Sequence, residues 1–241
     1  MLELLKDKSV AIVGPAQYMQ NSCLGHEIDG HDVVVRINRS IETTKTHEND
    51  IGKRTDILYS CLIEKFANAG RLNVKDLEAY GVKFICAPPK SEMNGISYST
   101  VLHDMVDIKN VQKISQTIPI RIVDHKFHTK LAQLVNCRPN TGFLAIYDLL
   151  RFELGSLSVY GFSFYLDGFI EGCKSGIEEE IGMTDEQFTK KCFVSKRHVQ
   201  KNMWLYAKST LLENPTIHLD NTLEKILKMN DLNKEEWKKC Q

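Results

Sequence analysis

The 241-residue chain has no excess of charge of either sign and no long apolar run. Lys and Arg number 31, and so do Asp and Glu, which makes the formal net charge zero. A non-specific nucleic-acid binder carries a basic excess, and a membrane helix needs a run of about 20 apolar residues. Glycine (14) and proline (6) are too few for a collagenous or disordered chain. The composition therefore predicts a globular protein with no membrane span and no nucleic-acid partner.

Cysteine pairs are also missing. The seven cysteines are odd in number and include no C-x-x-C pair, although zinc ligands usually come in tight pairs. His125 and His128 lie three residues apart, but no second ligand pair accompanies them. We therefore expect no metal site and reduced thiols. The N-terminus is charged and unlike a signal peptide, so the sequence favours a cytoplasmic location.

Short apolar runs rich in β-branched residues recur along the chain, with helical patterns between them. Strands are predicted at Ser9–Val13, Val33–Ile37, Asp56–Ser60, Lys83–Ala87, Ile120–Val123 and Ser156–Tyr160. Nearly continuous apolar strands are typical of a sheet that is covered on both faces. The alternation predicts an α/β class: one domain over residues 1–241, with a mostly parallel central sheet and helices on both faces.

Helical spacing of apolar residues predicts helices at Gly142–Leu154 and His198–Leu212, and a third helix that Asn221 caps. Between the first two helices lies a charged segment, residues 167–196, which contains several glycines and has little strand character. We expect this segment to be an insertion that acts as a lid over the sheet edge. Because insertions over strand ends shape binding pockets, we expect it to select the acceptor.

Charged residues flank the second predicted strand. Asp29 and Asp32 precede it, and Arg36 lies within it. We expect the two carboxylates to cap the preceding loop and to pair with the arginine, which is a structural role.

Ligands of open parallel sheets bind at the carboxyl ends of the strands. Gly14 follows the first strand, where backbone N–H groups can approach an anion, although a plain turn explains it equally well. Asn38 follows the second strand and can contact a ribose or phosphate. Asn140 or Thr141 can begin a helix, either as a simple cap or with free N–H groups that hold a phosphate or a carboxylate.

Three stretches, in the same order, resemble the motifs of one enzyme family. Residues 10–14 through 36–38 (RIN), continuing into residues 50–55 (DIGKRT), resemble the long donor-binding motif of the sialyltransferases, glycosyltransferase family 29. Residues 139–142 (PNTG) through 159–162 (VYGF) resemble its short motif, and Arg197-His198 resembles its late histidine motif. By these motifs the chain is identified as a compact bacterial or viral-type member.

The resemblance implies a Rossmann-like fold of the variant GT-A type. It also implies an inverting transfer of sialic acid from CMP-sialic acid to a hydroxyl of a glycan or glycolipid, with no metal and no cofactor beyond the CMP-sugar. The implied donor-binding residues are Gly14, Pro15, Ala16, Asn38, Asn140, Thr141, Gly142, Gly161, Phe162 and Ser163. His198 matches the general base of the family, a role that suits an imidazole near neutral pH. The alternative is that His198 only begins a helix and has no catalytic role.

Several positions depart from the family pattern. Pro15 replaces an Asn, Asn140 a Ser and Ser163 a common Gly. Met203 stands where the family has a Glu five residues after its histidine. A second late histidine, which in the family helps the departing phosphate, has no counterpart, and Tyr165 can substitute for it.

These departures leave three alternatives open. One is a transferase that uses CMP-Kdo, another CMP-activated keto acid. The second is a non-catalytic relative that binds a nucleotide or a glycan. The third is an NAD-type oxidoreductase, which the missing G-x-G-x-x-G loop disfavours.

Overall fold

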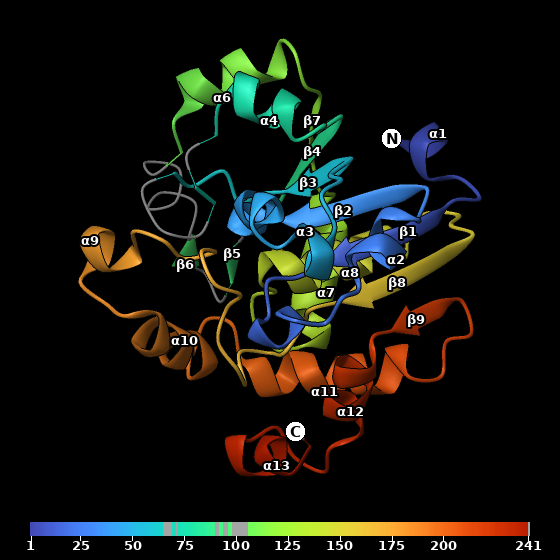
Figure 1. The fold of residues 1–241 in the computed structure, drawn as a ribbon, viewed down its shortest axis with the longest axis vertical. Coiled ribbons are helices and arrows are strands. Elements are labelled where there is room, and N and C mark those ends of the chain that lie inside the picture. Colours follow the sequence, from blue (N-terminus) through green and yellow to red (C-terminus); the bar gives the residue numbers. More distant parts are fainter. Residues whose placement is uncertain (65–68, 71, 90–91, 94–95, 98–105, 241) are drawn as a thin grey trace.

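A seven-stranded parallel sheet forms the centre of the computed structural model (Figure 1). The structure describes residues 1–240 except 65–68, 71, 90–91, 94–95 and 98–105. The strand order is β7-β4-β3-β2-β1-β8-β9, and every neighbouring pair is parallel. The strands are β1 (Ser9–Val13), β2 (Val33–Ile37), β3 (Ile57–Tyr59), β4 (Phe84–Ala87), β7 (Ile120–Ile122), β8 (Ser156–Tyr160) and β9 (Ile217–Leu219). The predicted α/β class with a mostly parallel sheet is confirmed.

All six predicted strands are present, and the sequence analysis missed three others. Edge strand β9 pairs with β8 and holds only three residues, one of them His218. So short a run shows no alternation, and only its pairing with β8 makes it a strand. The other two, β5 (Glu92–Met93) and β6 (Ile96–Ser97), form a small antiparallel pair.

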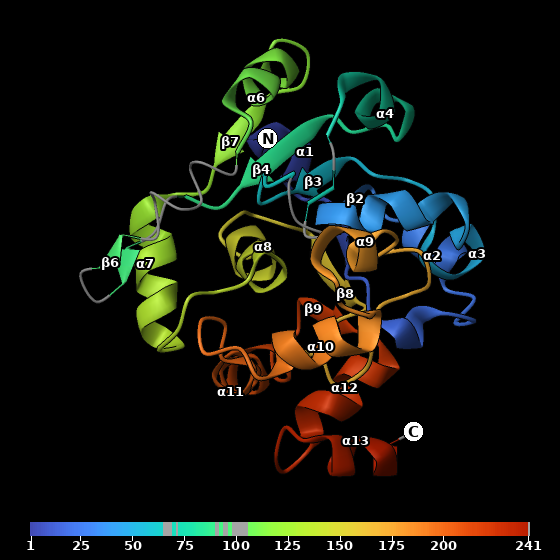
Figure 2. The same cartoon turned by 90° about the vertical axis from the view of Figure 1, so that its left-hand side faces the viewer.

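The sheet is covered on both faces (Figure 2). In β1, Val10 and Ile12 join one core cluster, while Ala11 and Val13 join another, because successive side chains of a strand point to opposite faces. The first face packs against α7 (His125–Leu134), α8 (Thr141–Leu149), α11 (Gln200–Leu211) and α12 (Asn221–Lys228). The second packs against α2 (Gly25–Asp29), α3 (Glu48–Ile51), α4 (Val74–Ala79) and α6 (Ile108–Ser115).

Six helices remain among the described residues. They are α1 (Leu2–Leu5), η1 (Gln17–Met19), η2 (Asn38–Lys45), α9 (Ile177–Ile181), α10 (Asp185–Phe193) and α13 (Lys234–Cys240). The 167–196 segment contains α9 and α10, which lie beside the central sheet (Figure 1). Within the described residues, no helix has the length and apolar character needed to cross a membrane.

Two predicted helix boundaries are corrected. Helix α8 ends at Leu149, not Leu154, because the chain turns after it. In this turn the Gly155 N–H donates to the Lys8 carbonyl, and the chain then continues into β8. Helix α12 is capped by Asp220, not Asn221: its carboxylate accepts hydrogen bonds from two N–H groups of the first turn.

The predicted pairing of Asp29 and Asp32 with Arg36 is wrong. Arg36 is fully buried, and its guanidinium donates to the carbonyls of Ile51, Gly52 and Arg54. Asp29 accepts the backbone N–H groups of Lys53 and Arg54, and Asp32 accepts both the N–H and the hydroxyl of Ser9. The arginine therefore stabilises the 51–55 loop from inside. The two aspartates, which precede β2, hold the backbone of this loop and the start of β1.

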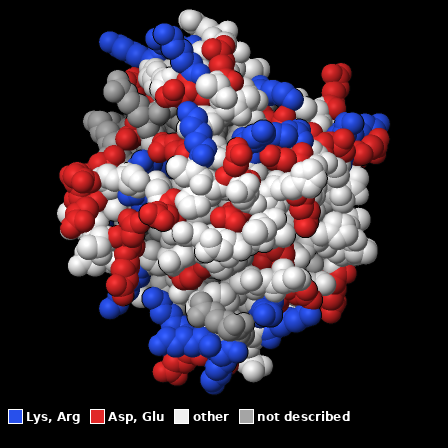
Figure 3. Space-filling view, viewed as in Figure 1, with Lys and Arg blue, Asp and Glu red and all other residues white. Residues whose placement is uncertain are grey.

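Side chains of both signs are interspersed over the face shown in Figure 3. This agrees with the zero net charge of the whole chain.

Candidate active site

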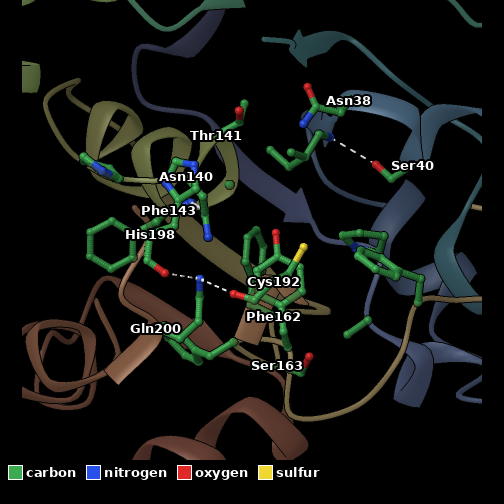
Figure 4. Close-up of a pocket in the computed structure, with 18 of the residues that line it drawn as sticks. Asn38, Ser40, Asn140, Thr141, Phe143, Phe162, Ser163, Cys192, His198 and Gln200 are labelled. Atoms are coloured by element: carbon green, nitrogen blue, oxygen red, sulfur yellow. Dashed lines mark hydrogen bonds between the residues drawn. The ribbon is translucent and has the colours of Figure 1, made fainter. Parts of the chain in front are cut away.

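A cavity of about 470 Å³ lies where β1, β2, β3 and β8 end, between the sheet and the 167–196 segment. Every donor-binding residue predicted from the sequence lines it except Gly14, and so does His198 (Figure 4). Gly14 packs behind the wall: a Cβ there would lie 2.3 Å from the carbonyl oxygen of Gly161. The fold thus brings together residues that are up to about 180 positions apart along the chain.

The N-terminus of α8 forms one wall of the cavity. Asn140 is its N-cap, and its Oδ1 accepts the N–H of Phe143 at 2.9 Å, so the residue that replaces the Ser of the family motif is a favourable helix cap. A Cβ on Gly142 would lie 2.8 Å from the Phe162 ring, which explains glycine there. The first N–H groups of a helix have no partner within it and carry partial positive charge. This wall can hold an anion.

Asn38 forms the facing wall (Figure 4). Its backbone has φ of 47°, a left-handed conformation that Asn adopts more readily than most residues. Its Oδ1 accepts the N–H of Cys61 at 2.9 Å. Because this bond fixes the amide orientation, the Nδ2 donor is left for a ligand.

A buried hydrogen-bond network holds the loop after β8. Asp220 Oδ2 accepts the N–H of Gly161 at 2.9 Å and the hydroxyl of Tyr18 at 2.8 Å. The Tyr18 oxygen in turn accepts the N–H of Phe162 at 3.0 Å. Burial raises the pKa of both Tyr18 and Asp220. The sequence analysis missed both residues, although an aspartate directly before a predicted helix was a signal for a cap.

His198 lies at the end of the cavity nearest the loop before α8. Its Nδ1 is 2.8 Å from the carbonyl oxygen of Arg138. A carbonyl oxygen can only accept, so Nδ1 carries the hydrogen and Nε2 of the neutral ring carries the lone pair. Burial, together with the charges of Arg197 and Arg138, lowers the pKa of His198 to about 4, although the hydrogen bond to the Arg138 carbonyl acts in the opposite direction. At neutral pH the ring is uncharged and can accept a proton at Nε2.

Gln200 connects His198 to the 167–196 segment. Its Nε2 donates to the carbonyl of His198 at 2.7 Å and to that of Cys192 at 3.5 Å (Figure 4). His198 itself precedes α11, which begins at Gln200, so it lies on a loop and not in the predicted helix.

Two departures from the family pattern differ in their structural effect. Met203 is fully buried in the core and does not line the cavity, so this position is one of packing here. Tyr165 lines the cavity, and burial raises its pKa. Its part in holding the leaving phosphate stays a prediction, which Tyr165→Phe tests by a lower kcat at unchanged CMP affinity.

The described part of the chain contains no group of three His, Cys, Asp or Glu side chains that could hold a metal ion. His128, one of the histidines considered above, is buried on α7. The six cysteines whose side chains are described are all free.

Comparisons with known proteins point to one enzyme family. A family model described as glycosyltransferase family 29 (sialyltransferase) matches residues 5–165. A mammalian sialyltransferase, solved in complex with Gal-beta-1-3GalNAc-ortho-nitrophenol, is 18% identical, with a TM-score of 0.52 over 88% of this chain and 69% of its own. A variant of the sialyltransferase CST-II, solved in complex with CMP, is 14% identical, with a TM-score of 0.53 over 90% of this chain and 88% of its own. No match was found among curated proteins.

The two solved structures share the fold, which is of the GT-A-like sialyltransferase type. The family model covers well over half of the chain, including the loops after β1, β2 and β8 and the start of α8. The chain therefore belongs to glycosyltransferase family 29, the sialyltransferases, and is a glycosyltransferase.

Proposed function

We propose that this protein transfers a sialic acid from CMP-sialic acid to a hydroxyl of a glycan or glycolipid, with inversion and without a metal ion. The observation that carries the proposal is that His198 lines the same cavity as the anion-binding end of α8 and the amide of Asn38. The CST-II structure, which shares the fold, contains CMP, and this supports the choice of nucleotide.

In this proposal the donor phosphate binds at the N-terminus of α8. The N–H groups of Thr141 and Gly142 and the amide of Asn140 supply fixed donors, and Asn38 donates from the facing wall. Such preorganised dipoles stabilise the charge that grows on the phosphate as it leaves. Gly161, Phe162 and Ser163 line the nucleotide, held in place by Asp220. Pro15 and Ala16 provide the remaining backbone wall.

His198 acts as the general base. The acceptor hydroxyl gives its proton to Nε2 while its oxygen bonds to the anomeric carbon. The bond from that carbon to the phosphate oxygen breaks at the same time, and its electron pair leaves with CMP. One displacement of this kind inverts the anomeric centre. The Arg138 carbonyl holds the tautomer and stabilises the imidazolium that forms.

Turnover assays with defined donors test the proposal directly. The protein is incubated with CMP-sialic acid or CMP-Kdo and with a panel of glycan acceptors, and CMP release and product anomers are measured. Transfer from CMP-sialic acid with inversion is the expected result, and transfer from CMP-Kdo alone assigns the other keto acid. CMP binding without turnover by a folded protein contradicts the proposal and leaves the non-catalytic reading. NAD binding in place of CMP binding would favour an oxidoreductase.

Removal of metal ions should leave the rate unchanged. Backbone dipoles and side-chain donors take over the charge stabilisation that a metal supplies in other transferases. Initial rates are compared after dialysis against EDTA and after addition of Mg²⁺ or Mn²⁺. A rate that vanishes with the chelator and returns with one of the cations would contradict metal-independent transfer.

Activity should persist at pH values well below the ordinary pKa of histidine, which is about 6.5. The pKa of His198 is lowered to about 4 in the free protein, and the base must be neutral to act. The acid limb of a kcat/KM–pH profile should therefore fall between about pH 4 and 6.5, with loss of activity as His198 protonates. An acid limb clearly above 6.5 would show that another group, or a different environment of His198, controls the reaction.

Replacing Asn38 with aspartate should weaken donor binding by about 1–3 kcal/mol. Aspartate can still accept the Cys61 N–H, but its second oxygen then faces the donor anions where an amide donor had been. Calorimetry with CMP measures the effect. Asn136→Asp is the matched control, because Asn136 is exposed and also left-handed, with φ of 46°, but does not line the cavity. Equal losses in the two variants would remove Asn38 from the donor site.

The 167–196 segment acts as a lid in this proposal. It lines the cavity opposite the strand ends through residues of its start and of α10. A segment in this position contacts the acceptor and excludes water from the reaction.

A further inference from the structure

The wall that the 167–196 segment contributes to the cavity contains a buried lysine. Lys174 is only 6% exposed and lines the cavity. Its Nζ lies 4.8 Å from the ring centroid of Phe169 and 5.4 Å from that of Phe188. The two rings come from the start of the segment and from α10, so the ammonium group is fixed between parts of the segment that are well separated in sequence.

Aromatic rings continue along this wall. The centroids of Tyr165 and Phe169 are 5.8 Å apart, and those of Phe169 and Phe188 are 6.1 Å apart. All three rings line the cavity. Ligand pockets of this kind combine apolar and aromatic walls with a few fixed polar groups that set orientation. A pyranose ring has apolar C–H faces and polar edges, which suits a wall built from rings around one cation.

The described residues that line the cavity carry charge of one sign. Its cationic residues are Arg39, Arg138, Lys174, Lys191 and Arg197. Among its described lining residues there is no Asp or Glu, although the whole chain has equal numbers of acidic and basic residues. Burial lowers the pKa of Lys174, and the charge of Arg39 lowers it further. An anion that binds among these positive charges is attracted to them, and the low dielectric of a buried site strengthens the attraction.

We propose that Lys174, together with Phe169 and Phe188, forms a subsite for an acidic sugar, in which the rings pack on the sugar and the ammonium binds its carboxylate. The subsite rests on the proposed function, because it specifies further which substrates the same cavity binds. The phosphate already has its place at the N-terminus of α8, on a different element. The carboxylate has two possible sources: the transferred sugar acid of the donor, or an acidic sugar of the acceptor.

Lys174→Met tests the subsite, because it removes the charge and keeps an unbranched apolar side chain. Lys190→Met is the matched control: Lys190 is exposed on α10 and does not line the cavity. Calorimetry measures the affinity for CMP and for CMP-sialic acid. Initial rates with lactose and with sialyl-lactose as acceptors give kcat/KM for a neutral and an acidic acceptor.

We expect Lys174→Met to cause a loss of about 10- to 100-fold for the ligand whose carboxylate binds at the subsite. That loss appears either in the affinity for CMP-sialic acid or in kcat/KM for sialyl-lactose. Affinity for CMP should stay within about threefold of wild type, as should every value for Lys190→Met, since exposed charges contribute little. A loss in CMP-sialic acid affinity assigns the subsite to the donor. A loss confined to sialyl-lactose assigns it to an acidic acceptor.

Unchanged affinity for CMP-sialic acid and unchanged kcat/KM for both acceptors would overturn the subsite. If the methionine variant does not bind CMP and is unfolded, Lys174→Gln repeats the comparison. Wild-type protein without turnover would defeat the proposed function but not this inference. In that case the affinities of wild type and variant for CMP-sialic acid, and for sialyl-lactose in the presence of CMP, still decide it.

Discussion

Replacing His198 with alanine should lower kcat by a factor of about 10²–10⁴, the usual contribution of a positioned general base. The reason is the fixed tautomer: Nδ1–H donates to the Arg138 carbonyl, with 2.8 Å between nitrogen and oxygen, so Nε2 is the atom that can take the acceptor proton. CMP affinity should change little, because the residues assigned to the nucleotide belong to other loops. Steady-state kinetics and calorimetry with CMP separate the two effects.

His198→Asn and His218→Ala are the controls. Asparagine can still donate a hydrogen bond to the Arg138 carbonyl but has no basic nitrogen, so it should be as inactive as alanine. His218 is exposed on edge strand β9, and its loss should leave kcat unchanged. Full activity of either His198 variant would exclude this residue as the base.

Replacing Asp148 with alanine should have the largest effect on stability, about 3–5 kcal/mol of unfolding free energy. Asp148 is fully buried on α8. Its carboxylate accepts the Tyr59 hydroxyl at 2.7 Å and forms ion pairs with Arg121 and Arg151. Its removal leaves a buried hydroxyl and a partly buried guanidinium without this acceptor. Urea unfolding monitored by circular dichroism measures the difference.

Arg151→Ala is the matched control for this network. The Arg151 side chain is 39% exposed and contacts the same carboxylate from the rim. Surface ion pairs contribute about 0–1 kcal/mol, so this variant should lose far less stability than Asp148→Ala. Equal losses would mean that the buried contacts to Tyr59 and Arg121 do not stabilise the fold as inferred. The network joins β3 and β7 to α8, the helix whose first turn is assigned to the donor phosphate.

Most of the sheet could be predicted from the sequence because several of its inner strands are nearly continuous apolar runs. Strands β1, β2 and β8 have the predicted boundaries to the residue. The edge strand β9 was not readable, since three residues show no period and its identity depends on pairing with β8. The ends of α8 and α11 were also misjudged, because turns set by contacts with other segments stop or start these helices.

Part of the candidate site could be predicted from the sequence. Asn38, Asn140 and His198 were predicted from local motifs and from the family resemblance, and they line one cavity. Tyr18 and Asp220 were not predicted, because their importance lies in a hydrogen-bond network that joins positions about 200 residues apart. Arg36 was misassigned for a similar reason: a buried guanidinium takes whichever carbonyls the fold brings to it, not the nearest carboxylates in sequence.

The sequence by itself determined the inner strands of the sheet and the family. Apolar periodicity, glycine positions and three ordered motifs are local properties, and they are present before the chain folds. Only the tertiary structure decided which polar atoms face one another: the Arg138 carbonyl against His198 Nδ1, the Cys61 N–H against Asn38, and Lys174 between two aromatic rings. Tautomers, free donors and lowered pKa values depend on burial and on partners distant in sequence, so they arise only when the loops meet in one cavity.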